Sequence, residues 1–182
     1  MVCVMLANGF EEVEALTVVD LLRRAGIETV TVGVKTKIIS GAHKINDTAD
    51  ITIGELDLCD IRMLVLPGGM PGAKNLQQNK KVIAAVSHCA EANKPIAAIC
   101  AAPMILGELG LLNGKKAVCF PSFKKHLKNA EITDNNVETD GKIITAVGAG
   151  AAFEFTAHII KMLKGREEAN RILEEIKCQV RI

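Results

Sequence analysis

The chain has 182 residues, of which 22 are Lys or Arg and 21 are Asp or Glu, so its net charge is only +1. This balance gives no reason to expect sequence-specific nucleic acid or an anionic membrane as a partner. Hydrophobic residues make up 49% of the chain but aromatic residues only 3%, which predicts an aliphatic core. The length is typical of one domain spanning residues 1–182.

Apolar runs and helical periodicity alternate along the chain. Strands are expected at residues 2–7, 27–34, 61–66, 95–99, 116–119, 130–133, 136–138 and 142–147. Helices are expected at residues 11–25, 76–92 with a break near 78–79, 102–109, 151–163 and 166–178. Turn signals leave room for a small hairpin within residues 38–53. The alternation predicts an α/β fold with a mostly parallel sheet covered by helices on both faces.

Ligands of such sheets bind beyond the carboxyl ends of the strands. The loops after Ala7, Leu66, Ile99 and Val147 are expected to open on that edge. The candidate functional residues of the chain should therefore be sought in these loops.

The N-terminal residues lack the charged, apolar and cleavage regions of a signal peptide, and no uninterrupted apolar run has the length of a membrane span. The six cysteines are irregularly spaced and include no C-x-x-C pair. In a chain of this size that spacing favours reduced thiols over a disulfide framework. We therefore expect a cytoplasmic protein with no membrane association.

Cys100 lies between a buried strand pattern and a helix pattern, at a predicted tight turn. Ala98 and Ala102 flank it at two residues on either side, and small neighbours are what a strand-to-helix turn carrying a nucleophile requires. The amides and dipole of the following helix are expected to lower the pKa of the thiol. Cys100 is therefore a candidate nucleophile, the alternative being a small buried hydrophobic residue.

Glu14 shares one face of its predicted helix with apolar residues, namely Val18, Leu21, Leu22 and Ala25. A carboxyl group on this face loses water, which raises its pKa and allows it to donate a hydrogen bond near neutral pH. The alternative is a carboxylate that bends from the edge of the face into solvent.

The run PGGMPG follows the strand that ends at Leu66. Adjacent glycines at Gly68 and Gly69 allow backbone N–H groups to approach a ligand closely, as an oxyanion site requires, although a purely structural turn has the same composition. No phosphate-loop lysine follows, and residues 148–150 match only part of a dinucleotide fingerprint, so no cofactor is expected.

None of the four histidines has metal-ligand spacing with Cys, Asp or Glu, so no metal centre is expected. His43 lies in the irregular segment before residue 46. It could reach a site only if that segment folds over it.

Four motifs, in order, resemble those of the ThiJ/PfpI superfamily: LANGFEEVE at 6–14, VLPGG at 65–69 with GAKNL at 72–76, AAICAAP at 97–103 and GAGAAFE at 148–154. They cover nearly the whole chain and are most similar to the branch of the parkinsonism-associated deglycase. The resemblance implies a flavodoxin-like three-layer sandwich, as in class I glutamine amidotransferases, and a homodimer.

The resemblance also implies roles for individual residues. Cys100 would be the nucleophile, and Glu14 the protonated carboxyl beside its sulfur, acting as general acid and base. The amides of Gly68 and Gly69, together with that of Ala101, would stabilise an anion.

Three positions depart from the family pattern. Phe120 stands where many relatives carry a histidine, and His43 lies near the place of a pocket arginine, so both are candidate pocket residues. Relatives with peptidase activity carry histidine directly after the nucleophile, where this chain has Ala101, which disfavours a cysteine peptidase.

Two function classes remain open. The first is an enzyme that acts on α-oxoaldehydes such as methylglyoxal, free or as early adducts on protein and nucleotide amines, without glutathione or metal. The second is a non-catalytic redox sensor or stress chaperone in which Cys100 is oxidised to sulfinate.

Overall fold

A seven-stranded sheet forms the centre of the protein in a computed structural model, which describes residues 1–180 and 182. The strand order is β10-β11-β7-β6-β1-β2-β5. All neighbours run parallel except β10, which is antiparallel to β11. The strands are β1 (Val2–Leu6), β2 (Thr29–Gly33), β5 (Ile51–Thr52), β6 (Met63–Leu66), β7 (Ile96–Ile99), β10 (Val137–Asp140) and β11 (Ile143–Ala146).

Six α-helices accompany the described strands: α1 (Glu12–Arg24), α2 (Gly72–Gln78), α3 (Lys80–Glu91), α4 (Pro103–Glu108), α5 (Ala152–Lys164) and α6 (Arg166–Glu175). The predicted break near residues 78–79 is confirmed. Asn79 separates α2 from α3, and its side chain accepts hydrogen bonds from the N–H groups of Lys81 and Val82. Such a cap satisfies amide groups that the first turn of α3 leaves without helical partners.

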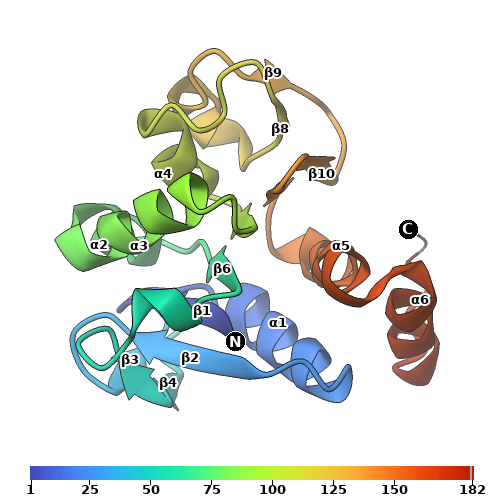
Figure 1. Cartoon of the computed structure of the whole chain (residues 1–182), viewed down its shortest axis with the longest axis horizontal. Coiled ribbons are helices and arrows are strands. Elements are labelled where there is room, and N and C mark those ends of the chain that lie inside the picture. Colours follow the sequence, from blue (N-terminus) through green and yellow to red (C-terminus); the bar gives the residue numbers. More distant parts are fainter. Residues whose placement is uncertain (181) are drawn as a thin grey trace.

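The helices cover both faces of the sheet (Figure 1). On β1, Val2, Val4 and Leu6 pack into the core shared with α1 and α5, whereas Cys3 and Met5 pack into the core beneath α2, α3 and α4. Successive side chains of a strand point to opposite faces, so a strand covered on both sides must be apolar throughout. The predicted mostly parallel sandwich of the flavodoxin-like type is confirmed.

Two small sheets lie outside the central one. The hairpin expected within residues 38–53 is confirmed as β3 (Ile38–Ser40) paired antiparallel with β4 (Asn46–Thr48). The second small sheet pairs β8 (Lys116–Ala117) with β9 (Glu131–Ile132) in parallel. Strand β5 was not predicted, because its two residues are too few to show a strand pattern.

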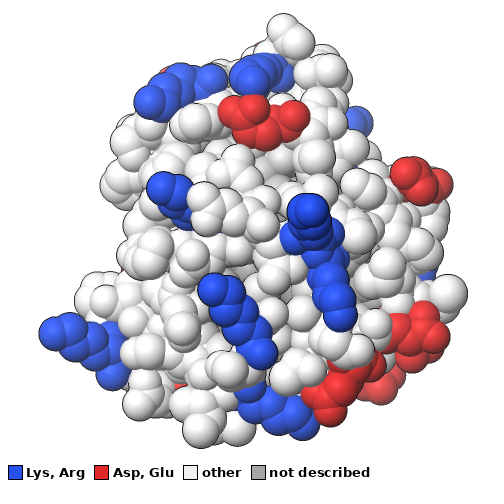
Figure 2. Space-filling view, turned by 90° about the vertical axis from the view of Figure 1, so that its left-hand side faces the viewer, with Lys and Arg blue, Asp and Glu red and all other residues white. Residues whose placement is uncertain are grey.

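Among the described residues, no helix combines the length and the apolar character that crossing a membrane requires. Figure 2 shows the side of the molecule that carries α2 and α3, where Lys and Arg side chains stand apart among uncharged residues. Acidic side chains gather toward the edges of this view. This face therefore has no continuous basic stripe of the kind that follows a nucleic-acid backbone.

Candidate functional site

Cys100, Gly68 and Glu14 come together at the carboxyl edge of the sheet, as predicted. Strands β1, β6 and β7 are parallel neighbours, so their carboxyl ends meet. Cys100 follows β7, Gly68 follows β6, and Glu14 lies in the first turn of the helix after β1.

Cys100 occupies the predicted turn between β7 and α4 in a left-handed conformation, with φ of +63°. Its N–H donates to the carbonyl oxygen of Ala146 at 2.9 Å, and its own carbonyl accepts from the N–H of Phe120, also at 2.9 Å. A non-glycine residue in this conformation is strained, and such strain is concentrated at functional sites. The two backbone bonds hold the half-buried cysteine in this conformation.

Glu14 is only 1% exposed, which confirms its predicted place on the buried face of α1. Its Oε2 accepts a hydrogen bond from the N–H of Gly68 at 2.8 Å, while its Oε1 is buried without a hydrogen-bond partner among the described residues. Burial raises the pKa of the Glu14 carboxyl to about 7, although the hydrogen bond from Gly68 and the neighbouring Cys100 thiol act in the opposite direction. The carboxyl thus exchanges a proton close to neutral pH.

The expected lowering of the Cys100 pKa is wrong. Burial, followed by the negative charge of Glu14, raises the pKa of the thiol to about 12. The N–H groups of Gly69 and Ala101 donate toward the sulfur and partly offset this rise. Helix α4 begins only at Pro103, so the sulfur lies outside its first turn, and desolvation outweighs the local amides. While Glu14 is ionised, the cysteine is therefore a thiol.

The three amides assigned to anion stabilisation differ in what they contact. Those of Gly69 and Ala101 donate toward the sulfur, and their role in stabilising an anion stays a prediction. That of Gly68 is already bonded to Glu14, so it positions the carboxyl and is not free to stabilise an oxyanion, contrary to the prediction. A Cβ on Gly68 would lie 2.6 Å from the Cβ of Cys100 and 2.7 Å from Oε2 of Glu14, so only glycine fits between the two.

Phe120, a candidate pocket residue, lies next to Cys100. The residue is 46% exposed, and its N–H donates to the carbonyl of Cys100. A Cβ placed on Gly148 would be 3.5 Å from Cδ2 of this ring and 4.0 Å from Sγ of Cys100. The ring, the glycine and the sulfur therefore line one side of the site.

His43 lies beside the first turn of α1. Its Nδ1 is 3.0 Å from Oε2 of Glu12 and 3.5 Å from Oε1 of Glu11. The hydrogen bond with Glu12, followed by the charge of Glu11, raises the pKa of His43. The hairpin thus folds onto the start of the helix that carries Glu14, but the contacts of His43 are with Glu11 and Glu12, so its place in the pocket stays a prediction.

Glu12 was not foreseen as a structural residue. It is 5% exposed, and its Oε1 accepts hydrogen bonds from the N–H groups of His43 at 2.8 Å and Ile45 at 3.4 Å. Burial would raise the pKa of Glu12, but its hydrogen bonds hold it below the ordinary value. The sequence alone does not separate the roles of Glu11, Glu12 and Glu14 at the start of α1. The hydrogen bonds from the hairpin show that Glu12 has a structural role.

Donor atoms of Glu11, Glu12 and His43 all lie within 4.8 Å of one another, close enough to share a metal ion. Spacing along the chain, which led us to expect no metal centre, could not anticipate this grouping. Tertiary folding brings the histidine to the two carboxylates.

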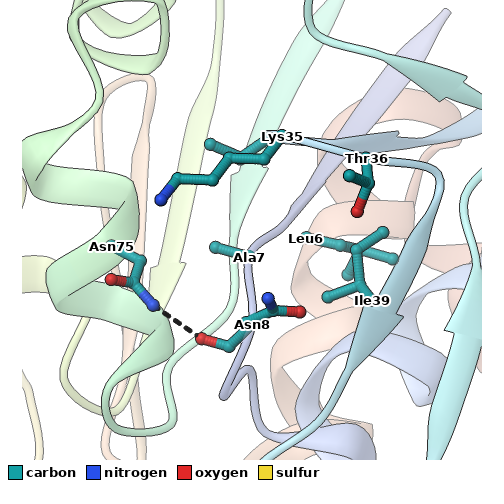
Figure 3. Close-up of a pocket in the computed structure, with 8 residues that line it drawn as sticks. Leu6, Ala7, Asn8, Lys35, Thr36, Ile39 and Asn75 are labelled. Carbon is teal, nitrogen blue, oxygen red and sulfur yellow. Dashed lines mark hydrogen bonds between the residues drawn. The ribbon is translucent and has the colours of Figure 1, made fainter.

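A separate small cavity lies between the ends of β1 and β2 and helix α2 (Figure 3). Asn75 donates from Nδ2 to the carbonyl oxygen of Asn8 at 2.8 Å across its rim, and Lys35 extends over it. Neither Cys100 nor Glu14 lines this cavity, so it is distinct from the cysteine site.

A comparison with protein-family models matches residues 1–162 to the DJ-1/PfpI family. The chain belongs to the DJ-1/PfpI family. The match extends from β1 into α5 and so includes every site residue described above.

Individual relatives agree with this assignment. DJ-1 homolog B of Arabidopsis thaliana is 34% identical over 92% of this chain, which spans only 39% of that protein. A deglycase of Pyrococcus abyssi is 28% identical, over 90% of this chain and 99% of its own length. The structure of oxidized DJ-1 from Toxoplasma gondii superimposes with a TM-score of 0.94 at 34% identity, covering 98% of both chains.

Proposed function

We propose that the protein is a cysteine-dependent, glutathione-independent enzyme that converts α-oxoaldehydes such as methylglyoxal, free or as early adducts on protein and nucleotide amines. The observation that carries this proposal is the pairing of Glu14, whose pKa is about 7, with the thiol of Cys100. A general acid and base works best when its pKa lies near the working pH. The relative from Pyrococcus abyssi that is named a deglycase supports the same reaction class.

In the first step, Glu14 as carboxylate takes the thiol proton while the sulfur adds to the aldehyde carbon. Because the thiol pKa is raised, proton removal must accompany attack, and Glu14 is the group in contact with the thiol. Glu14 then passes this proton to the alkoxide oxygen, so the product is a neutral hemithioacetal and Glu14 is again a carboxylate. The amides of Gly69 and Ala101 stabilise the negative charge that develops on sulfur and oxygen.

In the second step, Glu14 removes the hydrogen from the former aldehyde carbon and returns a proton to the neighbouring carbon. The hydroxyl proton of the hemithioacetal moves to the neighbouring carbonyl oxygen in the same step, so the product is a thioester of a 2-hydroxy acid. Water then cleaves the thioester, which releases lactate and restores the thiol. The net change is the addition of one water molecule to methylglyoxal, so one carbon is oxidised at the expense of its neighbour.

The test is to incubate the purified protein with methylglyoxal and to measure lactate by mass spectrometry, beside a Cys100→Ser variant. We expect lactate from the unaltered protein and only the background rate from the variant. If both samples form lactate at the background rate, the enzyme proposal fails.

A redox sensor or stress chaperone is the second candidate. When protonated, the buried Oε1 of Glu14, which has no partner among the described residues, can donate a hydrogen bond to an oxidised sulfur. The relative from Toxoplasma gondii is described in its oxidized form. Gain of two oxygen atoms at Cys100 under mild peroxide, together with no Cys100-dependent lactate, would favour this candidate.

We also propose a homodimer in the cytoplasm. Val13 and Leu16 lie one turn apart on the outer side of α1 and are 49% and 36% exposed, so together they offer an apolar strip to a second copy. The six cysteines are free, as is usual in a reducing compartment.

A further inference from the structure

We propose that Phe120 makes the site selective for neutral α-oxoaldehydes that carry a flat apolar substituent, such as an aryl group, in preference to methylglyoxal. This inference rests on the proposed function and names the substrate class of the same site. It follows from the surroundings of the Cys100 sulfur.

The first observation is an exposed aromatic ring beside the nucleophile. The chain contains five Phe and neither Trp nor Tyr, so aromatic surface is scarce. Phe120 nevertheless leaves 46% of its surface in solvent, while its backbone is bonded to that of Cys100. An aromatic side chain gains free energy by covering such surface, and a ligand seated at the sulfur can provide the cover.

The second observation is the absence of a side chain at Gly148, which leaves room for an atom beside the ring and the sulfur. The point where a Cβ on Gly148 would stand is 3.5 Å from Cδ2 of the Phe120 ring and 4.0 Å from Sγ of Cys100. These are ordinary van der Waals separations, so atoms of a ligand can occupy the same region. A side chain at Gly148 would fill it.

The third observation concerns charge. The charge that acts on Cys100 is that of Glu14, and the charge that acts on Glu14 is that of Glu11, so both are negative. Phe120 is uncharged and stands at the position where many relatives carry a histidine, which can be positively charged. A substrate with its own carboxylate or phosphate would be repelled here, whereas a neutral one is not.

A planar substituent on the carbon next to the reacting aldehyde can pack against the Phe120 ring once the sulfur has added. Aromatic pairs in such contact favour association by about three- to tenfold beyond simple burial. A methyl group offers little surface for this contact.

The test compares kcat/KM for phenylglyoxal with kcat/KM for methylglyoxal in the unaltered protein, Phe120→Ala and Phe120→Leu. We expect the ratio to fall by about three- to tenfold in Phe120→Ala and by less in Phe120→Leu, chiefly through KM. Ile132→Ala is the matched control, because Ile132 is 39% exposed on β9 and does not line the site; its ratio should stay unchanged. Gly148→Ala, which fills the space, should penalise phenylglyoxal more than methylglyoxal.

A second readout does not depend on turnover. The rates at which iodoacetamide and N-benzyl-iodoacetamide alkylate Cys100 are measured by peptide mass spectrometry in the same variants. The benzyl reagent should lose its advantage when Phe120 is replaced by Ala. Absence of Cys100-dependent product from either aldehyde would defeat the proposed function, while the alkylation ratio would still test the aromatic contact. Equal ratios in the unaltered protein and Phe120→Ala, in alkylation or in turnover, would overturn the inference.

Discussion

The N–H of Gly68 donates to Oε2 of Glu14 across 2.8 Å, and this bond joins two loops at one edge of the sheet. It fixes one carboxyl oxygen, while the other, Oε1, stays buried without a partner among the described residues. The proton that the carboxyl exchanges near pH 7 therefore lies beside the thiol of Cys100.

Glu14→Gln should make Cys100 more reactive toward alkylation but inactive as a catalyst. The amide removes the negative charge that raises the thiol pKa and still offers an N–H to the sulfur, so iodoacetamide should label Cys100 several-fold faster at pH 7. An amide cannot exchange the proton, so lactate formation should fall by roughly 10² to 10⁴. Peptide mapping and lactate assays measure the two effects. Full activity in Glu14→Gln would remove Glu14 as the acid and base.

The stability of the protein should fall as pH rises toward 7. The pKa of Glu14 is about 7 in the folded protein against an ordinary 4.5, so between these values the unfolded chain releases a proton that the folded one keeps. The contribution of Glu14 to the free energy of unfolding is therefore fully present below pH 4.5. It decreases as pH rises through 7, by about 3 kcal/mol in total. Urea unfolding at pH 5 and pH 8 gives the difference, and Glu14→Gln should lack this component. An identical pH dependence in the variant would refute the shifted pKa.

Gly68→Ala should disrupt the site. The added Cβ would lie 2.6 Å from the Cβ of Cys100 and 2.7 Å from Oε2 of Glu14, so one side chain must move. We expect loss of most Cys100-dependent activity and a destabilisation of about 1–3 kcal/mol, typical of overpacking. Gly150→Ala is the matched control, because a Cβ there meets nothing within 4 Å. Comparable losses of activity and stability in both variants would show that the effect does not come from crowding between Cys100 and Glu14.

Glu12→Gln should lower the pKa of His43, because the hydrogen bond with Glu12 is the main cause of its rise. Titration of the histidine followed by NMR measures this change. The retained Oε1 should keep accepting from the N–H groups of His43 and Ile45, so their hydrogen exchange should remain slow. Glu12→Ala removes that acceptor and should speed exchange at both amides. Slow exchange in Glu12→Ala would show that Glu12 does not hold the hairpin.

The protein should have twice the chain mass of 19.5 kDa by light scattering at micromolar concentration. Val13→Glu or Leu16→Glu, which put a charge on the exposed strip of α1, should shift the mass toward that of one chain. Leu109→Glu is the control, since Leu109 is 38% exposed at the end of α4, and it should leave the mass unchanged. A single-chain mass for the unaltered protein would contradict the dimer.

The sequence by itself determined the class of fold and the two residues at the centre of the site. Strands buried on both faces must be apolar throughout, and helices that cover a sheet must be apolar on one side, so both leave local patterns. The same rules placed Glu14 on a buried helical face and Cys100 at a turn with small neighbours.

Only the tertiary structure decided what surrounds these residues. The Gly68 amide is engaged by Glu14, Glu12 is covered by a hairpin more than 25 residues away, and the thiol pKa rises where a helix dipole predicted a fall. Each of these facts depends on which groups from distant parts of the chain are buried next to one another. Burial and charge act through distance in space, and a linear pattern records only distance along the chain.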